Sequence, residues 1–245
     1  MSARIVGHRG AALVEPENTL ASFRRAVADG ADLLECDVHL SADGQLVVMH
    51  DKTIDRTAAE DSPRRTGAIA DLTRADLDEV RLAGGGAVPA LDAVLDIATE
   101  AGVPIYVEVK AVAAAGRTAQ LLVDRGLARG SDDPDTAPAW IISFSQEALR
   151  LAREAAPDLP LAAVTKTPDH CFWDFAQEVE AQAVSLPIRT LTPHDVNLVR
   201  ELGLRLNVWT LNEAELLFRA TELGADTITT DDPAWARRIL TGASV

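Results

Sequence analysis

Residues 205–230 read RLNVWTLNEAELLFRATELGADTITT and contain one complete strand–helix–strand unit. Arg205 to Thr210 and Asp226 to Thr230 are short apolar runs of the kind that forms buried strands. Between them, Asn212 to Leu223 repeats apolar residues at intervals of three and four, which predicts a helix. A strand, a helix and a second strand in this order imply a right-handed crossover and parallel pairing of the two strands.

The same alternation runs through the rest of the chain. Six further strands are predicted, at Arg4 to His8, Leu33 to Val38, Ile105 to Lys110, Trp140 to Phe144, Leu161 to Thr165 and Ala183 to Leu186. Helical patterns separate several of them, at Thr19 to Asp29, Leu91 to Ala101 and Gln146 to Ala156. An open doubly wound sheet would alternate in the same way, but no glycine-rich dinucleotide fingerprint follows the first strand. Eight such units in 245 residues favour closure into an α/β fold of the (β/α)8 TIM-barrel type.

The composition agrees with this fold and limits the partners. Apolar residues make up 47% of the chain and aromatic residues only 4%, so Ala, Val, Leu and Ile must build the core of one domain over residues 1–245. With 38 acidic and 23 basic residues, the formal charge is −15. That charge argues against nucleic acid or an anionic membrane surface as partner. Any phosphate group must therefore be bound by a local group of side chains and not by the overall charge of the surface.

The ends and the cysteines bear on localisation. The start of the sequence has no secretory signal, and no stretch is long enough for a membrane helix. Cys36 and Cys171 form no disulfide framework and are each predicted to be small buried apolar residues. These features predict a cytoplasmic protein without stable membrane insertion, and they leave the oligomeric state open.

Residues 39–50 interrupt the repeat as a hairpin. Asp43 and Gly44 are the residue types that supply the two positive φ angles of a type I′ turn. A two-residue turn at this position predicts that His50 lies opposite Asp37 on the neighbouring strand.

Residues 52–88 are the second interruption. They are rich in Asp, Arg and Gly, with a weak helix at Arg74 to Val80. We expect an inserted loop region that is too short for a core of its own.

Charged residues gather at the predicted carboxyl ends of three strands, where barrel enzymes place their reacting groups. Alternation puts Glu35 and Asp37 on one face of their strand, and Glu108 shares a face with Lys110. Three carboxylates would repel one another unless a cation joined them, and oxygen ligands suit Mg²⁺ or Ca²⁺. The alternative is a structural ion-pair network in which Lys110 and Arg9 neutralise the acids. No Cys or His spacing indicates zinc.

His8 ends the first strand, and the hairpin brings His50 toward the same carboxylates. Two imidazoles beside one phosphate can take a proton from the attacking oxygen and give one to the leaving oxygen. Glu17 and Asp51 are candidates for orienting them. The remaining histidines are expected to be solvated or locally hydrogen-bonded, outside the site: His39, His170 and His194.

Trp209 lies at the end of a predicted strand. Its ring would make an apolar wall for a ligand at the barrel mouth. Packing in the core is the alternative for this side chain.

With these motifs in order, the chain resembles the glycerophosphodiester phosphodiesterase family over nearly its full length. The matching stretches are His8-Arg9-Gly10, Pro16-Glu17-Asn18-Thr19, Glu35-Cys36-Asp37-Val38, Asp43-Gly44, His50-Asp51, Glu108-Val109-Lys110, Val208-Trp209-Thr210 and the segment 224–233. Thr227 stands where the family commonly has glycine, a departure that affects packing. The insertion after His50 is short for the family, which leaves the head group open.

The resemblance implies a divalent cation, Mg²⁺ or Ca²⁺, held by Glu35, Asp37 and Glu108. It implies that His8 and His50 are the general acid and base. It implies that the substrate-binding residues include Arg9 and Lys110. The family's substrates include glycerophosphocholine and glycerophosphoethanolamine, which give sn-glycerol 3-phosphate and an alcohol. We expect a cyclic phosphate formed by the neighbouring glycerol hydroxyl, with His8 as first base and His50 as first acid, although the sequence leaves their order and direct attack by water open.

Three other functions compete with this interpretation. A lysophospholipase D-like enzyme would need an apolar lip for the acyl chain, and the acidic insertion shows none. A barrel lyase or isomerase that stabilises an enolate on a carboxylate-bound metal would use a lysine base, for which Lys110 is the candidate. A non-catalytic phosphate-binding module has no need of three acids beside two histidines.

Overall fold

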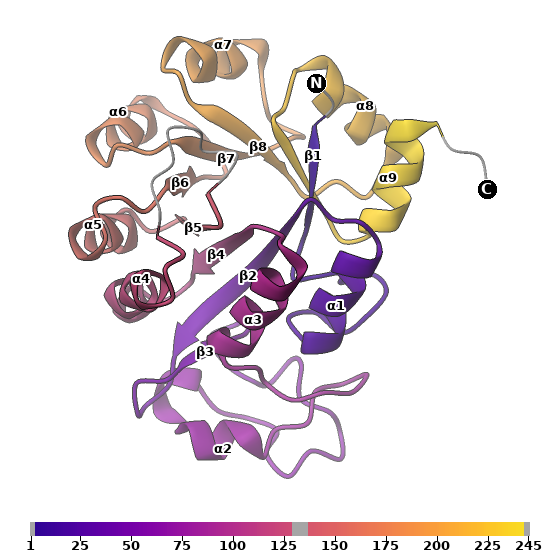
Figure 1. Cartoon of the computed structure of the whole chain (residues 1–245), viewed down its shortest axis with the longest axis vertical. Coiled ribbons are helices and arrows are strands. Elements are labelled where there is room, and N and C mark those ends of the chain that lie inside the picture. The colour runs from indigo at the N-terminus through magenta and orange to yellow at the C-terminus, as the bar shows by residue number, and fades with distance from the viewer. Residues whose placement is uncertain (1–2, 129–136, 243–245) are drawn as a thin grey trace.

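The computed structural model describes residues 3–128 and 137–242, and within them strands and helices alternate around a closed barrel (Figure 1). The parallel strands are β1 (Arg4–Gly7), β2 (Leu33–Leu40), β4 (Ile105–Val109), β5 (Ala139–Ser143), β6 (Leu161–Val164), β7 (Ala183–Pro187), β8 (Arg205–Trp209) and β9 (Thr227–Thr230). Strand β1 pairs with both β2 and β9, which closes the sheet. The predicted TIM barrel and the positions of its eight strands are confirmed.

Helices surround the strands (Figure 1). They are α1 (Leu20–Ala28), α3 (Leu91–Ala101), α4 (Ala115–Asp124), α5 (Gln146–Ala155), α6 (His170–Glu178), α7 (Pro193–Glu201), α8 (Ala214–Glu222) and α9 (Pro233–Thr241). Several begin at a Ser, Thr or Asp side chain that accepts a backbone N–H of the first turn. Such caps satisfy donors that the helix itself leaves unpaired.

The core has two layers because side chains alternate along each strand. One layer lies between the strands and the helices and includes Leu34, Cys36 and Val38 of β2. The other lies inside the barrel and includes Leu33 of β2 with Tyr106 and Trp140 of its neighbours. Glu35 and Asp37 therefore point into the barrel, as the alternation predicted.

The hairpin exists, but the predicted two-residue turn is wrong. In β3 (Leu46–Val48), Val48 pairs with Val38, and the Ser41 N–H donates to the Gln45 carbonyl, so three residues form the loop. Only Gly44 of the loop has a positive φ, +77°. A three-residue loop needs one residue of this kind, whereas a type I′ turn needs two. Asp43 instead accepts the hydroxyl of Ser41.

The register therefore slips by one residue, and His50 does not lie opposite Asp37. Strand β3 ends at Val48, and the Asp37 carbonyl accepts the N–H of Met49. His50 follows as the first residue outside the ladder. Its carbonyl oxygen lies 3.2 Å from Nε2 of His39, which is buried and locally hydrogen-bonded.

The segment after the hairpin shares a small apolar cluster with Val47 and Met49 of the hairpin. It contains a short 3₁₀ turn, η1 (Ile69–Asp71), and helix α2 (Arg74–Asp78), and it lies beyond β3 at the bottom of Figure 1. Its apolar residues are irregularly spaced in sequence but gather in one small buried cluster that includes Ile54, Ile69, Leu72, Leu77, Val80, Leu82 and Val88. The segment is thus held against the hairpin by apolar packing as well as by hydrogen bonds.

Two further predictions can be compared with the structure. Cys36 is buried, but Cys171 is exposed at the start of α6, so its predicted burial is wrong. Its neighbour Phe172 takes the buried position on that helix. Within the described residues, no helix is long and apolar enough to cross a membrane.

Candidate active site

A cavity of about 580 Å³ opens at the carboxyl ends of the barrel strands. All the residues predicted for the site line it except Asp37, which lies buried directly behind it. The lining residues are His8, Arg9, Glu35, His50, Glu108, Lys110, Ile142, Phe144, Val164, Lys166, Ser185, Asn207, Trp209, Thr210 and Thr229. The fold therefore gathers residues from far apart in the sequence, between His8 and Thr229, around one pocket of the size that small ligands occupy.

The turn after β1 carries Arg9 into the carboxylate cluster. Arg9 has a positive φ of 52°, which is unusual for a residue with a side chain. In this conformation its backbone N–H donates to Glu35 Oε2 at 2.9 Å, and its Nε lies 3.2 Å from Asp37 Oδ2. Asn18, with φ of 57°, donates from Nδ2 to the same Asp37 oxygen at 2.8 Å. Strained backbone that sets polar contacts in a pocket is typical of a functional site.

The three carboxylates form a compact oxygen cluster. Glu35, Asp37 and Glu108 each offer an oxygen within 4.8 Å of the other two. Lys110 Nζ lies 2.7 Å from Glu108 and 3.4 Å from Asp37. Glu35 Oε1 and Asp37 Oδ1 are buried and accept no hydrogen bond from the described residues, although Asp37 Oδ1 is the oxygen that lies near Lys110. Ligand oxygens of Mg²⁺ and Ca²⁺ lie about 2 to 2.6 Å from the ion, so the cluster fits a hard cation.

Electrostatics in the cluster favour such an ion. Burial, followed by the charge of Asp37, raises the pKa of Glu35 to about 8. The pKa of Glu108 is raised by burial and by Asp37, against the effect of Lys110. Burial would raise the pKa of Asp37 as well, but Arg9 and Lys110 hold it below its ordinary value. Two cations face three acids, so the predicted ion-pair network exists. Ionisation of all three acids would leave one negative charge in excess, which a bound cation would offset.

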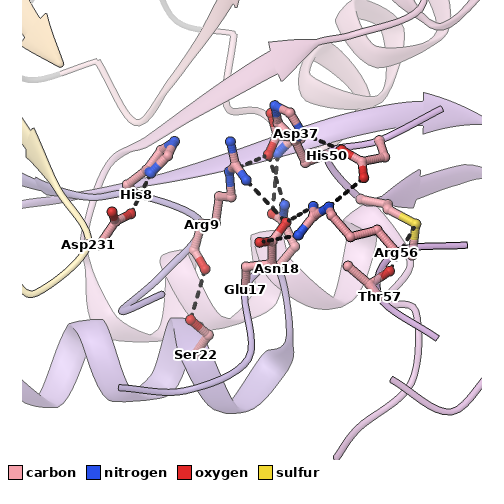
Figure 2. Close-up of polar contacts among 12 residues, drawn as sticks. His8, Arg9, Glu17, Asn18, Ser22, Asp37, His50, Arg56, Thr57 and Asp231 are labelled. Atoms are coloured by element: carbon pink, nitrogen blue, oxygen red, sulfur yellow. Dashed lines mark hydrogen bonds and ion pairs between the residues drawn. The ribbon is translucent and has the colours of Figure 1, made fainter. Parts of the chain in front are cut away.

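His8 is held by a residue from the other end of the chain. Its Nδ1 lies 2.6 Å from Oδ1 of Asp231, which follows β9 (Figure 2). Burial would lower the pKa of His8, but the hydrogen bond to Asp231 and the charge of Glu35 raise it overall. Asn212 Nδ2 in turn donates to Asp231 Oδ2. The Nδ1 contact directs the other ring nitrogen toward the cavity, where Nε2 is 4.0 Å from Glu35.

His50 is held by its neighbour in sequence. Its Nδ1 lies 2.7 Å from Oδ1 of Asp51, which matches the orienting role predicted for Asp51. Burial lowers the pKa of His50, and Arg9 and Lys110 add to the effect, against the charge of Asp37 and the hydrogen bond to Asp51. The pKa values of the two histidines are therefore shifted in opposite directions.

The opposite wall of the cavity is mostly uncharged. Phe144 and Trp209 meet edge to face with ring centroids 5.7 Å apart. Trp209 lines the cavity and also packs on the inner core. Below it, Asn207 donates to Ser185 at 2.6 Å and accepts the hydroxyl of Thr227 at 2.8 Å. Thr227 thus adds a hydrogen bond to the barrel interior at the position where glycine was expected.

Sequence reasoning missed three polar residues around the site: Asn18, Arg56 and Asp231. Asn18 and Asp231 lie in the motif segments quoted above, but neither has a pattern that indicates its partner. Arg56 lies in the inserted segment, whose composition indicated only a solvated loop. All three contacts join segments far apart in the sequence.

Acids, imidazoles and cations at the mouth of a (β/α)8 barrel define an enzyme that works on phosphate esters. Residues 8–235 match the model of the glycerophosphoryl diester phosphodiesterase family. A probable glycerophosphodiester phosphodiesterase 1 from Mycobacterium tuberculosis is 32% identical over 94% of this chain and 89% of its own. A putative glycerophosphoryl diester phosphodiesterase from Silicibacter pomeroyi has the same fold, with a TM-score of 0.82, 26% identity, and coverage of 98% and 94%.

A phosphodiesterase from Oleispira antarctica, solved in complex with the product sn-glycerol-3-phosphate, shares the fold with a TM-score of 0.85 at 21% identity. It covers 98% of this chain and 97% of its own. The chain belongs to the glycerophosphoryl diester phosphodiesterase family and is an enzyme of that activity.

Proposed function

We propose that the protein hydrolyses glycerophosphodiesters to sn-glycerol 3-phosphate and an alcohol with the help of one divalent cation and two histidines. The observation that carries the proposal is the buried oxygen cluster of Glu35, Asp37 and Glu108, with two oxygens that accept no hydrogen bond from the described residues. His8 and His50 line the same cavity. The product complex of the Oleispira antarctica relative supports the choice of product.

The three carboxylates would hold Mg²⁺ or Ca²⁺. A bound cation supplies electrostatic stabilisation to the negative charge that develops on the phosphoryl oxygens. Arg9 and Lys110 bind the remaining phosphate charge from the cavity wall, and Lys110 Nζ is anchored to Glu108. Trp209 and Phe144 pack against the carbon atoms of the substrate.

In the first step, the 2-hydroxyl oxygen of the glycerol attacks phosphorus and one histidine takes its proton. The bond from phosphorus to the head-group oxygen breaks, and the other histidine protonates that oxygen. Water then opens the cyclic phosphate with the two roles exchanged, which restores both histidines. The raised pKa of His8 and the lowered pKa of His50 favour His8 as the first acid and His50 as the first base, the reverse of the order expected from the sequence.

The proposal is tested with a panel of glycerophosphodiesters and lysolipids, with released sn-glycerol 3-phosphate quantified in Mg²⁺, Ca²⁺ and excess chelator. We expect cation-dependent release from the glycerophosphodiesters alone. Release of lysophosphatidic acid from lysolipids would favour the lysophospholipase D-like alternative. No release from any substrate would overturn the proposal.

A matched pair of substrates tests the cyclic phosphate. A diester with a free 2-hydroxyl and its 2-O-methyl derivative differ only in the proposed nucleophile. The first should be cleaved with a transient cyclic phosphate visible by phosphorus NMR, and the second should resist cleavage. Equal rates for the two would show direct attack by water.

A further inference from the structure

Arg56, in the inserted segment, joins two acids that hold different parts of the site. Its Nη1 and Nη2 donate to the two carboxylate oxygens of Glu17 at 3.0 and 2.6 Å, and its Nε donates to Asp51 Oδ2 at 2.6 Å. Figure 2 shows Arg56 between Glu17 and the side of the site where His50 lies. Each of the three nitrogen atoms of the Arg56 guanidinium thus donates to one of two carboxylates.

Each of these carboxylates has a second partner in the cavity wall. Glu17 Oε1 also accepts from Arg9 Nη1 at 3.1 Å. Asp51 Oδ1 lies 2.7 Å from His50 Nδ1. A continuous chain of charge-assisted bonds therefore runs from Arg9 through Glu17, Arg56 and Asp51 to His50.

Arg56 is placed to orient other side chains rather than to bind the substrate itself. It does not line the cavity, so it does not touch a substrate there. Its side chain is 49% exposed, and ion pairs at such exposure contribute little to folding stability. The planar fork of arginine, in contrast, fixes two carboxylates in direction, which a lysine cannot do.

We infer that Arg56 is a positioning residue that orients the His50 ring through Asp51 and the Arg9 guanidinium through Glu17, so that the inserted segment forms part of the catalytic apparatus. The inference rests on the proposed role of His50. Arg9 has a second carboxylate partner, Asp37, at 3.2 Å, whereas among the described residues the side-chain partners of the Asp51 carboxylate are Arg56 and His50. Loss of Arg56 should therefore affect proton transfer more than phosphate binding.

The test compares steady-state kinetics of wild type, Arg56→Ala and Arg56→Lys with glycerophosphodiester substrate. Both variants should lose about 10- to 100-fold in kcat with KM nearly unchanged, because partners behind a reacting group typically matter by this amount. Millimolar methylguanidinium should restore part of the lost kcat in Arg56→Ala. Unchanged kcat in both variants would overturn the inference.

Arg81→Ala is the matched control, since Arg81 lies in the same segment and pairs with Asp61. It should keep wild-type kcat, and an equal loss in this variant would show a general effect of the segment. Asp51→Asn combined with Arg56→Ala should be no worse than the more damaging single variant, whereas independent losses that multiply would refute action through Asp51.

A measurement without substrate separates this inference from the proposed reaction. The ring nitrogen resonances of His50 in the free protein should shift in Arg56→Ala and Arg56→Lys and stay in place in Arg81→Ala. An unchanged His50 spectrum in a folded Arg56 variant would overturn the positioning role, whatever the substrate. If Arg56→Ala does not fold, Arg56→Lys gives the same decision.

Discussion

Strands β1, β2 and β4 line one wall of the cavity with charged groups, whereas β5 to β9 line the other wall with uncharged ones. The first wall carries His8, Arg9, Glu35, Glu108 and Lys110. The second carries apolar and amide or hydroxyl side chains, with Lys166 as its one charged group among the described residues. The contrast predicts that the reacting groups come from the first half of the barrel and that the second half shapes the space for the rest of the substrate.

The largest loss of kcat is expected for changes to the three carboxylates of the charged wall. Glu35→Gln, Asp37→Asn or Glu108→Gln should each lower kcat by about a thousandfold or more, because each removes a proposed metal ligand worth several kcal/mol in the transition state. Glu178→Gln, which changes an exposed acid paired with Arg150, serves as control. Full turnover of the wild type in excess chelator would contradict the metal requirement.

The next largest loss of kcat is expected for changes to the two histidines of the cavity. His8→Ala and His50→Ala should each lose at least about a hundredfold in kcat while the fold, measured by circular dichroism, is retained. His194→Ala removes an exposed imidazole outside the cavity and should behave as wild type. A wild-type rate in either cavity variant would remove that histidine from the mechanism.

A smaller effect is expected in how the apparent affinity for Mg²⁺ depends on pH. The raised pKa of Glu35, about 8, means that the metal-free carboxyl holds a proton at pH 7. A cation must displace this proton, so apparent Mg²⁺ affinity should rise with pH, about tenfold per unit, and level off above the pKa. Calorimetry in two buffers of different ionisation enthalpy would detect the released proton. Glu35→Gln should abolish this pH dependence, and an affinity that is flat between pH 6 and 8 in the wild type would contradict it.

The smallest expected effect concerns the uncharged wall. Lys166→Met should change kcat little and shift the relative KM of anionic and cationic head groups by about 1 kcal/mol or less, as expected for an exposed charge. Lys52→Met, an exposed lysine of the inserted segment outside the cavity, controls for the loss of charge. A large fall in kcat for Lys166→Met would place a reacting group on the second wall and break the comparison.

Much of this contrast was readable in the sequence. Period-two alternation put Glu35 and Asp37 inside the barrel, and the repeat of strands and helices fixed the closure. Both depend on local pattern and on the geometry of parallel strands. The hairpin register was not readable, because Asp43-Gly44 fits a two-residue turn and a three-residue loop alike.

Contacts between distant segments were beyond local pattern as well. The partners Asn18 to Asp37, Arg56 to Glu17 and Asp231 to His8 depend on how loops from different strands meet at one end of the barrel. Small polar residues in such loops look alike in a sequence, whether they face solvent or a buried carboxylate. For His39 the sequence left two expectations open, a solvated ring and a locally hydrogen-bonded ring. The fold decides between them, because it places the ring beside the His50 carbonyl.

The bond between His8 and Asp231 spans 223 residues of the chain. His8 precedes Asp231 by this whole length of chain, and the two residues meet because β9 pairs with β1 and brings the residue after β9 beside the ring. A chain that ended before residue 231 would keep Glu35, Asp37 and Glu108 but lack the carboxylate that orients His8. The orientation of the His8 ring therefore depends on the closure of the barrel between β1 and β9.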